Sequence, residues 1–584
     1  DVLGSRGLGD VYKRQVSMDH EILTDVLRDR YGMPGFVRSD MTAVSRLYDW
    51  HFIAETPEEA IRLGLEAGVD LQLYDFPHDV WQNAIACLIE EGKMKMSVLD
   101  TACRRVLRMK FLLGLFENPF TDENRAESVL RCPKHLAVAE KIAEKSIVLL
   151  KNDGLLPLKK NLQRVAVIGP AADTVSYGDY TEYRGREGAV TVLDGIRATV
   201  SPETEVVYAR GCNFLGQALH PFDPGMLRDE DGGYGLTGRY YNGPVPEGTP
   251  VQVRSDRTIN FNWIFSLPNP ELDANCFSVA WTGSVIMPHT MDGCIGLSTQ
   301  DSMRLYLDDE LLIDGWGKDK SADQALDFHF EAGRAYKIRI EFVNDGRGAR
   351  VIFGYSAGRE NFSAAVEAAR KADVAILCMG DNEETSGENF DRTDLNLPGR
   401  QLELVKAVYA TGTPVVLVLQ SGRPVTANWE NDHLPAILEA WFPGEQGGTA
   451  IARTLFGDAI PGGRLPITFP RSVGQIPCHY SRRPGGGKKY VEMDWMPLYP
   501  FGYGLTYTTF AYHDLRPDRA KIAPDESVTV SFTVENTGAF TGDAVPQLYV
   551  RDLFSSVVKP ERQLAAFTRV TLCLLYTSPS PRDP

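Results

Sequence analysis

The sequence has no long hydrophobic run, and its cysteines and histidines form no metal-binding pattern. No apolar stretch approaches the ~20 residues of a membrane-spanning helix, so we expect no membrane partner. The nine cysteines include no C-x-x-C pair, and the ten histidines do not cluster. We therefore expect free thiols, no metal and no cofactor. Unpaired thiols favour a reducing compartment, which leans towards the cytoplasm, although a cytoplasmic or a secreted location stays open.

Positive charge is also in short supply. The formal net charge is -17, which argues against a nucleic-acid partner and favours a neutral or cationic one. The length of 584 residues corresponds to about four domains at roughly 150 residues each. A homo-oligomer stays open.

Both ends of the chain differ in character from the rest. Residues 1–15 have neither a signal-peptide core nor helical periodicity, and residues 572–584 break off a strand pattern abruptly. Both stretches resemble translated sequencing-adapter DNA. We therefore treat them as non-native tails and expect the natural chain to be cut at both ends.

The first α/β segment contains a carboxylate at the end of a predicted strand. Gly35–Asp40 reads as a short buried strand after a helix, and Thr56–Glu59 reads as a capping box that opens the next helix. Val69–Leu73 reads as a second strand. This order is typical of a parallel α/β fold, in which a polar residue at a strand's C-terminal end lies where chemistry is done. The alternative is that Asp40 only caps the following turn.

A second α/β region is interrupted by a β-rich stretch. Apolar strands are predicted at 147–150 and 165–168, and again at 374–377 and 414–419. No G-x-G-x-x-G follows the strand at 165–168, which argues against a nucleotide site. Between about 212 and 358, strands rich in Val, Ile, Tyr, Phe and Trp replace the helical periodicity. We predict a β module inserted into a single α/β domain.

A second group of carboxylates follows the predicted strand that ends at Gly380. The stretch Glu383–Arg392 is acidic and contains a glycine, so it reads either as a solvated loop or as a catalytic one. A hydrolase with two carboxylates needs one that stays ionised and one that is held protonated. A strand-end Asp and a loop Glu could supply that pair.

Several motifs in chain order resemble glycoside hydrolase family 3 with an inserted PA14 domain. They are Gly35–Asp40, Ala67–Leu71, Arg105–Lys110, Gly114–Phe116, Ser146–Leu150, Leu156–Leu158, Glu388–Arg392, Leu397–Gln401, Gly463–Pro470 and Pro500–Tyr507. Within the β-rich stretch, Ser298–Tyr306 and Leu312–Trp316 resemble a PA14 domain.

The resemblance implies a retaining exo-acting β-glycosidase acting on a carbohydrate substrate. Asp40 would be the nucleophile and Glu388 the general acid and base, with Glu383 and Glu384 as rivals for the second role. Glu388 is preferred because the family places its acid three residues before the Asp-Arg pair. Asp391–Arg392 itself would be a structural ion pair that fixes the loop.

The family's fold implies seven segments along this chain. They are the tail at 1–15, the C-terminal part of a (β/α)8 TIM barrel at 16–120, the first half of an α/β sandwich domain at 121–211, a PA14-like β-barrel or sandwich at 212–358, the second half of the α/β sandwich at 359–505, a truncated fibronectin type III-like β-sandwich at 512–571, and the tail at 572–584. A TIM barrel needs about 250 residues, and roughly 100 are present here. We therefore expect this fragment to be inactive on its own and, with apolar surface exposed on the partial barrel, poorly soluble.

Candidate substrate contacts lie next to the nucleophile and in the insert. The family usually has Trp where this chain has Met41, so the surface that stacks on the sugar differs. The insert is interpreted as a lid, an independent carbohydrate-binding module or a passive spacer. Trp316 and Trp281 could stack on sugars, although aromatics in a β module are more often core.

Three hypotheses about the function and the substrate remain. The first is a β-glucosidase that releases terminal glucose from short oligosaccharides or plant glycosides. The second is a β-xylosidase, because one hydroxymethyl group separates the two substrates. The third is a non-catalytic carbohydrate-binding protein on a glycosidase scaffold.

Overall fold

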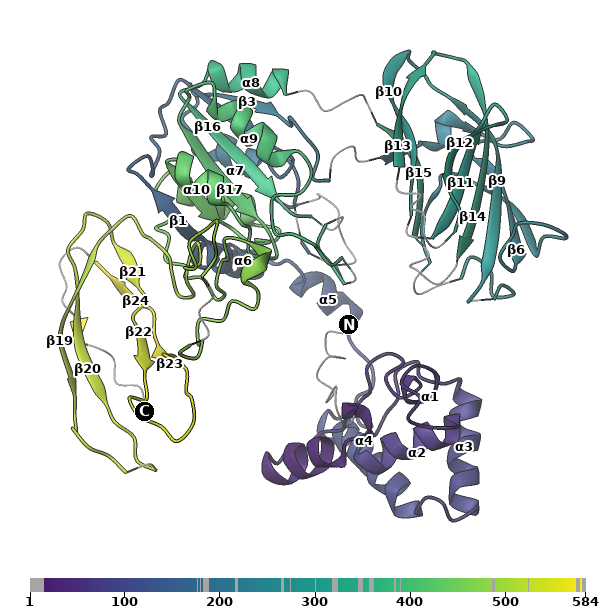
Figure 1. Ribbon diagram of the computed structural model, residues 1–584, viewed down its shortest axis with the longest axis horizontal. Coiled ribbons are helices and arrows are strands. Elements are labelled where there is room, and N and C mark those ends of the chain that lie inside the picture. The colour runs from purple at the N-terminus through teal and green to yellow at the C-terminus, as the bar shows by residue number, and fades with distance from the viewer. Residues whose placement is uncertain are drawn as a thin grey trace. The chain divides into compact units, whose positions relative to one another are not determined.

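The structure, a computed structural model, describes residues 15–584 apart from short gaps. The gaps are residues 176, 179, 182–187, 216–218, 264–266, 274, 300, 318–323, 345–349, 357–361, 383–384, 389, 486–488, 524, 574–577 and 580–584. The predicted tail at 1–15 falls outside the described residues except for Gln15, whereas residues 572, 573, 578 and 579 of the predicted tail at 572–584 are described. The chain divides into two compact units, Asp1–Cys132 and Pro133–Pro584, and each is described by itself (Figure 1).

The N-terminal unit is largely helical in its described part. Its elements are the 3-10 helix η2 (Val16–Met18), the π-helix η3 (Glu21–Arg30), α1 (Arg46–Asp49), α2 (Pro57–Ala67), α3 (His78–Glu90), α4 (Met96–Leu112) and α5 (Glu123–Val129).

Helix α2 begins and ends where the sequence predicts. Thr56 Oγ1 accepts a hydrogen bond from Glu59 N at 3.2 Å, Pro57 occupies the first turn, and Gly68 ends the helix at a φ of 122°. The Glu59 carboxylate accepts from Glu55 N at 2.9 Å. The glutamate of the predicted capping box therefore reaches one residue further back than Thr56.

The two predicted strands of this unit are reduced to a single parallel bridge between Arg38 and Leu71. Ser39 N donates to Leu71 O at 2.9 Å and Asp70 N donates to Val37 O at 2.8 Å. The predicted strand Gly35–Asp40 is therefore wrong in extent, and so is its burial, since Arg38 and Asp40 are exposed. A parallel strand is normally hydrogen-bonded on both sides, and here each segment has one neighbour among the described residues.

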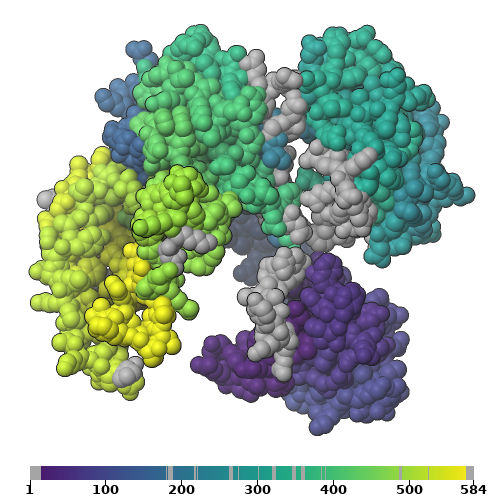
Figure 2. All heavy atoms as spheres, in the orientation of Figure 1, coloured from purple at the N-terminus to yellow at the C-terminus, as the bar shows by residue number. Residues whose placement is uncertain are grey.

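Two small hydrophobic clusters hold the N-terminal unit together, and α2 contributes to both. Ala60 and Ala67 pack in one cluster with Val44 and Leu47, while Ile61 packs in the other with residues of α3. Figure 2 shows the described residues up to α4, in purple to violet, packed against one another.

The second unit is built around a six-stranded sheet with helices on both faces. Its elements are α6 (Pro133–Ser146), β1 (Val148–Asn152), β2 (Arg164–Ile168), α7 (Val192–Thr199), β3 (Glu205–Ala209), α8 (Ser363–Arg370), β16 (Val374–Gly380), α9 (Gln401–Tyr409), β17 (Val415–Gln420), α10 (Asn428–His433), β18 (Ala436–Glu439) and α11 (Gly447–Leu455). The strand order is β1-β18-β17-β16-β2-β3, parallel except where β1 meets β18.

Every residue of β16 and β17 is buried, as a strand covered on both faces requires. Helices α6, α7 and α11 contribute to the core on one face of the sheet, and α8 and α9 contribute to the core on the other. Strands β1, β2 and β3 precede the β-rich stretch in the chain, and β16, β17 and β18 follow it. Residues on both sides of that stretch therefore build one sheet.

The β-rich stretch forms two sheets that share a core. Its elements are β4 (His220–Pro221), η4 (Pro224–Met226), β5 (Leu227–Arg228), β6 (Leu236–Asn242), β7 (Gln252–Asp256), β8 (Asn260–Asn262), β9 (Phe277–Ile286), β10 (Met291–Ser298), β11 (Ser302–Leu307), β12 (Glu310–Gly315), β13 (Gln324–Phe330), β14 (Ala335–Asn344) and β15 (Arg350–Ser356). One sheet has the order β12-β11-β14-β9-β6-β7 and the other β13-β10-β15-β4. We call this part the β module.

Trp281 lies in the core of the β module. Its side chain is 0% exposed, and its Nε1 donates to the buried Asp256 Oδ2 at 2.7 Å. Tyr240 OH donates to the same oxygen at 2.5 Å. The prediction that Trp281 could stack on a sugar is therefore wrong, because the core encloses the ring.

The chain ends in a further group of strands. They are β19 (Phe510–Pro517), β20 (Val530–Asn536), β21 (Gly542–Ala544), β22 (Gln547–Val550), β23 (Gln563–Phe567), β24 (Val570–Leu572) and β25 (Ser578–Pro579), preceded by the 3-10 helix η5 (Val473–Gln475). Strand pairs are antiparallel throughout the described residues of this part.

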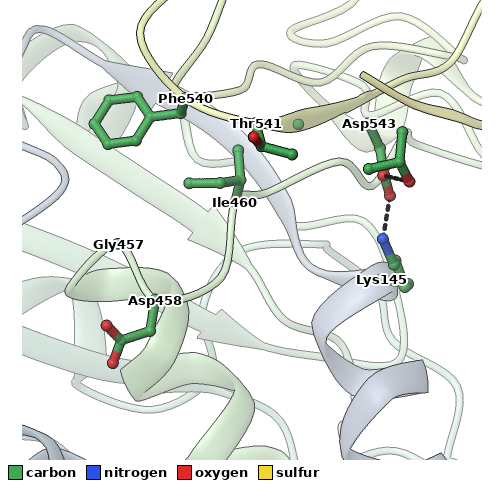
Figure 3. A pocket seen from close by; sticks show the side chains of 9 residues that line it. Lys145, Gly457, Asp458, Ile460, Phe540, Thr541 and Asp543 are labelled. Carbon is green, nitrogen blue, oxygen red and sulfur yellow. Dashed lines mark hydrogen bonds and ion pairs between the residues drawn. The ribbon is translucent and has the colours of Figure 1, made fainter. Parts of the chain in front are cut away.

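A pocket of about 400 Å³ lies between these strands and the α/β domain (Figure 3). Lys145 of α6 forms an ion pair with the buried Asp543 of β21, which also accepts from Arg569 Nη1 at 3.0 Å and from Thr571 Oγ1 at 2.6 Å. Burial raises the pKa of Asp543, but the bonds from Lys145, Thr571 and Arg569 outweigh it and hold that pKa below its ordinary value. The pocket contains none of the predicted site residues, and this ion cluster joins the two parts of the fold.

Candidate active site

Asp40 follows directly on the parallel bridge between Arg38 and Leu71. Its side chain is exposed, and Met41 N donates to its Oδ1 at 2.8 Å. Thr42 then adopts a φ of 60°, so the chain turns sharply after the carboxylate. The predicted position at the C-terminal end of a parallel segment is therefore present, although the segment is shorter than a strand.

A buried carboxylate supports this turn from beneath. Asp75 Oδ2 accepts from Ser39 Oγ at 2.5 Å, and Asp75 Oδ1 accepts from Val44 N at 2.5 Å and Ser45 N at 3.1 Å. Leu73 N donates to Ser39 Oγ at 2.9 Å. Residues on both sides of Asp40 are thus tied to one side chain. The sequence interpretation missed Asp75, and its place just after the second predicted strand was the available signal.

A second buried carboxylate fixes the other end of the parallel segments. Asp70 accepts from Arg28 Nη2 at 2.6 Å, from Arg105 Nη1 at 2.9 Å and from Val37 N at 2.9 Å. Burial lowers the pKa of Arg28, although Asp70 opposes that effect. These contacts bring η3, α4 and both parallel segments to one point.

Glu388 lies in the loop that follows β16, and its side chain is exposed. Its rivals Glu383 and Glu384 lie outside the described residues. Asp40 and Glu388 belong to different units, so each is placed only within its own.

The structure corrects the ion pair predicted in this loop. Arg392 pairs with Asp381 at 3.4 Å and with Asp394 at 3.5 Å, where we predicted Asp391. A buried carboxylate needs a counter-ion more than an exposed one does, so Arg392 pairs with Asp381 at the start of the loop. Asp381 is 2% exposed, and Asp391 is exposed.

A third buried carboxylate stands at the end of β18, beside Asp381. Glu439 is 0% exposed, and its Oε1 accepts from Trp441 N at 2.8 Å. Burial raises the pKa of Glu439 well above its ordinary value, the bond from Trp441 N opposes this, and the nearby Asp381 adds to the increase. Its Oε2 is buried and has no hydrogen-bond partner among the residues that the structure describes. The buried carboxyl group of Glu439 therefore holds its proton more tightly than an exposed glutamate does.

The other two predicted contact residues lie at the surface of their parts. Met41 is 41% exposed next to Asp40. Trp316 is half-buried at the end of β12, and the guanidinium carbon of Arg304 lies 4.9 Å from its ring centroid. One face of the Trp316 ring is thus covered by Arg304, which Asp314 Oδ1 holds by accepting from its Nε at 2.9 Å.

Among the residues that the structure describes, no group of three or more His, Cys, Asp or Glu side chains is placed to hold a metal ion. None of the described helices is long and apolar enough to cross a membrane.

Comparison with known families covers most of the chain. Residues 147–507 match the glycosyl hydrolase family 3 C-terminal domain, residues 8–109 match the family 3 N-terminal domain, and residues 544–573 match a fibronectin type III-like domain.

Individual relatives agree with these matches. A β-xylosidase of Formosa agariphila is 32% identical over 95% of this chain and 60% of its own length. A β-glucosidase of Rhizobium radiobacter is 33% identical over 94% of this chain and 68% of its own length. The crystal structure of a β-glucosidase from Kluyveromyces marxianus in complex with glucose superposes with a TM-score of 0.71, at 26% identity, over 97% of this chain and 70% of that one.

The fold is thus an α/β fold followed by a fibronectin type III-like domain. The chain belongs to glycoside hydrolase family 3. It spans 60% of the length of the Formosa relative and 68% of that of the Rhizobium relative.

Proposed function

We propose that the protein is a retaining, exo-acting β-glycosidase, and in the first place a β-glucosidase. The observation that carries the proposal is family membership combined with the positions of Asp40 and Glu388. Each follows a parallel segment, and each lies in a stretch that matches a family 3 domain. The relatives named β-glucosidase and β-xylosidase support the same class of reaction.

In the proposed mechanism Asp40 attacks the anomeric carbon while Glu388 donates a proton to the departing glycosidic oxygen. A covalent glycosyl–Asp40 ester forms and the aglycone leaves as an alcohol. Glu388, now ionised, removes a proton from water, which attacks the same carbon and releases the sugar and free Asp40. Retention requires the two carboxyl groups to lie about 5–5.5 Å apart during the reaction.

We infer a barrel around Asp40 from the N-terminal unit. Its parallel bridge, its helices and its match to the family's N-terminal domain support part of a (β/α)8 barrel. Large apolar side chains such as Phe111 and Leu112 are exposed on α4, as expected where further barrel elements would pack. We expect activity to require those elements, so that the 584-residue chain alone is inactive.

We further infer that the β module is a PA14-like domain acting as a lid on the aglycone side. Its two sheets with a common core, inserted between β3 and β16, support a folded module. Met41 and Trp316 are proposed as substrate contacts, Met41 because it is exposed beside Asp40 and Trp316 because its ring is held at the module's surface.

The test uses the protein with its complete natural N-terminal region and measures hydrolysis of aryl β-glucoside and aryl β-xyloside. We expect the glucoside to be the better substrate. We expect Asp40→Asn to abolish turnover and Glu388→Gln to reduce it by about 10²–10⁴-fold. Full activity in Asp40→Asn would disprove the assigned nucleophile.

A β-xylosidase is the second candidate, because the Formosa relative with that name is 32% identical to this chain. A preference for the xyloside would establish it. If the protein hydrolyses neither substrate but still binds glucose or xylose, the non-catalytic carbohydrate-binding alternative replaces both.

A further inference from the structure

The loop that carries Glu388 leaves β16 at a point fixed by the backbone. Gly380 has a φ of 141°, and a Cβ there would lie 1.9 Å from Gln420 O, so only glycine fits. The fully buried Gln401 side chain accepts from Gly380 N at 2.8 Å and donates to Gly380 O at 2.8 Å. The first residue after this point, Asp381, therefore has a well-defined position.

One oxygen of Asp381 holds the loop at two places on either side of Glu388. Oδ1 accepts from Thr385 Oγ1 at 3.0 Å and from Arg392 Nη1 at 3.4 Å. Glu388 lies three residues after Thr385 and four before Arg392. The buried Asp381 carboxylate thus holds together the two ends of the segment that carries the proposed acid, Thr385 and Arg392.

The other oxygen of Asp381 joins this closed segment to the end of β17. Oδ2 accepts from Ser421 Oγ at 2.7 Å and lies 3.4 Å from Arg423 Nε. Arg423 Nη2 in turn donates to Thr385 O at 3.0 Å. Two arginines balance the buried charge, as a carboxylate in such a place needs.

We propose that Asp381 is a positioning residue that holds the loop of Glu388 in the geometry required for proton donation. This inference rests on the proposed function, because it assumes that Glu388 is the acid. General acid catalysis requires the donor within hydrogen-bond reach of the leaving oxygen, and a shift of about 1 Å can cost about 10²-fold in rate. Asp381 acts only through Glu388 and touches no substrate.

The test exploits the leaving group, because a glycoside with a good leaving group needs little help from an acid. We compare Asp381→Asn with the wild-type protein, both with the complete natural N-terminal region, on phenyl and 2,4-dinitrophenyl β-glucosides. We expect kcat/KM for the phenyl glycoside to fall about 10²-fold, and for the dinitrophenyl glycoside less than about threefold.

Asp394→Asn is the matched control, since Asp394 is an exposed partner of the same Arg392. We expect it to leave both rates unchanged. A merely structural role for Asp381 would lower both rates by the same factor, and that result would overturn the proposal.

A second measurement does not depend on activity. In the 584-residue chain, hydrogen exchange of peptides within 380–392 should be faster in Asp381→Asn than in Asp394→Asn, while peptides of β17 keep their protection. If Asp381→Asn unfolds β17 as well, Thr385→Ala removes one bond to Asp381 and should still accelerate exchange of the loop. Unchanged exchange in the loop would overturn the proposal. A wild-type protein inactive on all glycosides would instead refute the proposed function.

Discussion

Two parallel segments of this chain end near a proposed catalytic carboxylate, and they are stabilised in different ways. In the N-terminal unit, Arg38 and Leu71 make a single bridge, and the ionic contacts of Asp70 with Arg28 and Arg105 hold the segments. In the α/β domain, β16 is paired on both sides and every residue is buried. Where the hydrogen-bonded ladder is short, charged side chains fix the strand ends; where the sheet is wide, the apolar core does.

The largest effect should come from removing the charge that holds the N-terminal segments. Asp70→Ala leaves the buried Arg28 without its counter-ion and should destabilise this unit by about 3–5 kcal/mol. Hydrogen exchange should accelerate across residues 16–112 and stay unchanged in β16 and β17. Glu66→Gln, which removes an exposed pair with Arg62, is the control and should cost less than about 0.5 kcal/mol. Equal effects of the two variants would contradict the comparison.

A core truncation should have the complementary effect. Leu417 is a fully buried residue of β17, and Leu417→Ala should destabilise the α/β domain by about 2–5 kcal/mol. Val37, next to the single bridge, is only half-buried, so Val37→Ala should cost the N-terminal unit less. A urea titration monitored by hydrogen exchange, with peptides of each unit analysed separately, measures the loss of stability in both variants. A larger loss for Val37→Ala would mean that the parallel segment depends on apolar packing.

The support beneath Asp40 should show an intermediate effect. Ser39→Ala removes the donor to Asp75 Oδ2 and the acceptor for Leu73 N, which should cost about 1–3 kcal/mol locally. Exchange of peptides covering 39–47 should accelerate most. In the full-length protein, we expect turnover to fall along with it, because the turn that carries Asp40 loosens. Unchanged exchange at 39–47 would show that the backbone bridge alone suffices.

The smallest expected effect on stability comes from the difference between two buried carboxyl groups, Asp70 and Glu439. Asp70 has two arginine partners, whereas burial raises the pKa of Glu439 well above its ordinary value. The folded-state pKa of Glu439 lies above its unfolded value, so its contribution to stability is greatest at pH values below the unfolded pKa and declines as pH rises towards the folded pKa. Glu439→Gln should abolish this decline, and its melting temperature relative to wild type should rise between pH 4 and pH 8. A constant difference would show that Glu439 keeps an ordinary pKa.

The sequence predicted the α/β sheet better than the N-terminal segments, for a physical reason. A continuous apolar run such as 374–380 is buried on both faces wherever it pairs, so its pattern alone identifies β16. Gly35–Asp40 carries a similar local signal, but the number of partners beside it is not encoded within those residues. The length of a strand depends on how many neighbouring strands it has, and among the described residues this segment has one neighbour.

Side-chain partners were less predictable than elements. The partner of Arg392 is Asp381, whose proximity depends on how the loop closes, so adjacency in sequence was misleading. Trp281, in contrast, could have been assigned to the core, because it shares a strand face with Phe277 and Val279, and all three are fully buried. Asp40 and Glu388 could be selected from the sequence as site candidates, while the hydrogen bonds of the buried Asp75 and Asp381 required the fold.

The strand order of the α/β domain has a consequence for folding during translation. β1 pairs with β18, and the whole β module is translated between them. Val148 therefore cannot pair with Glu439 until Glu439 has left the ribosome. Such non-local pairing slows folding and leaves apolar strands uncovered meanwhile. We expect the β module to fold before the α/β domain during translation. We expect chaperones to bind the nascent segment from β1 to β3 until β16 to β18 have been translated.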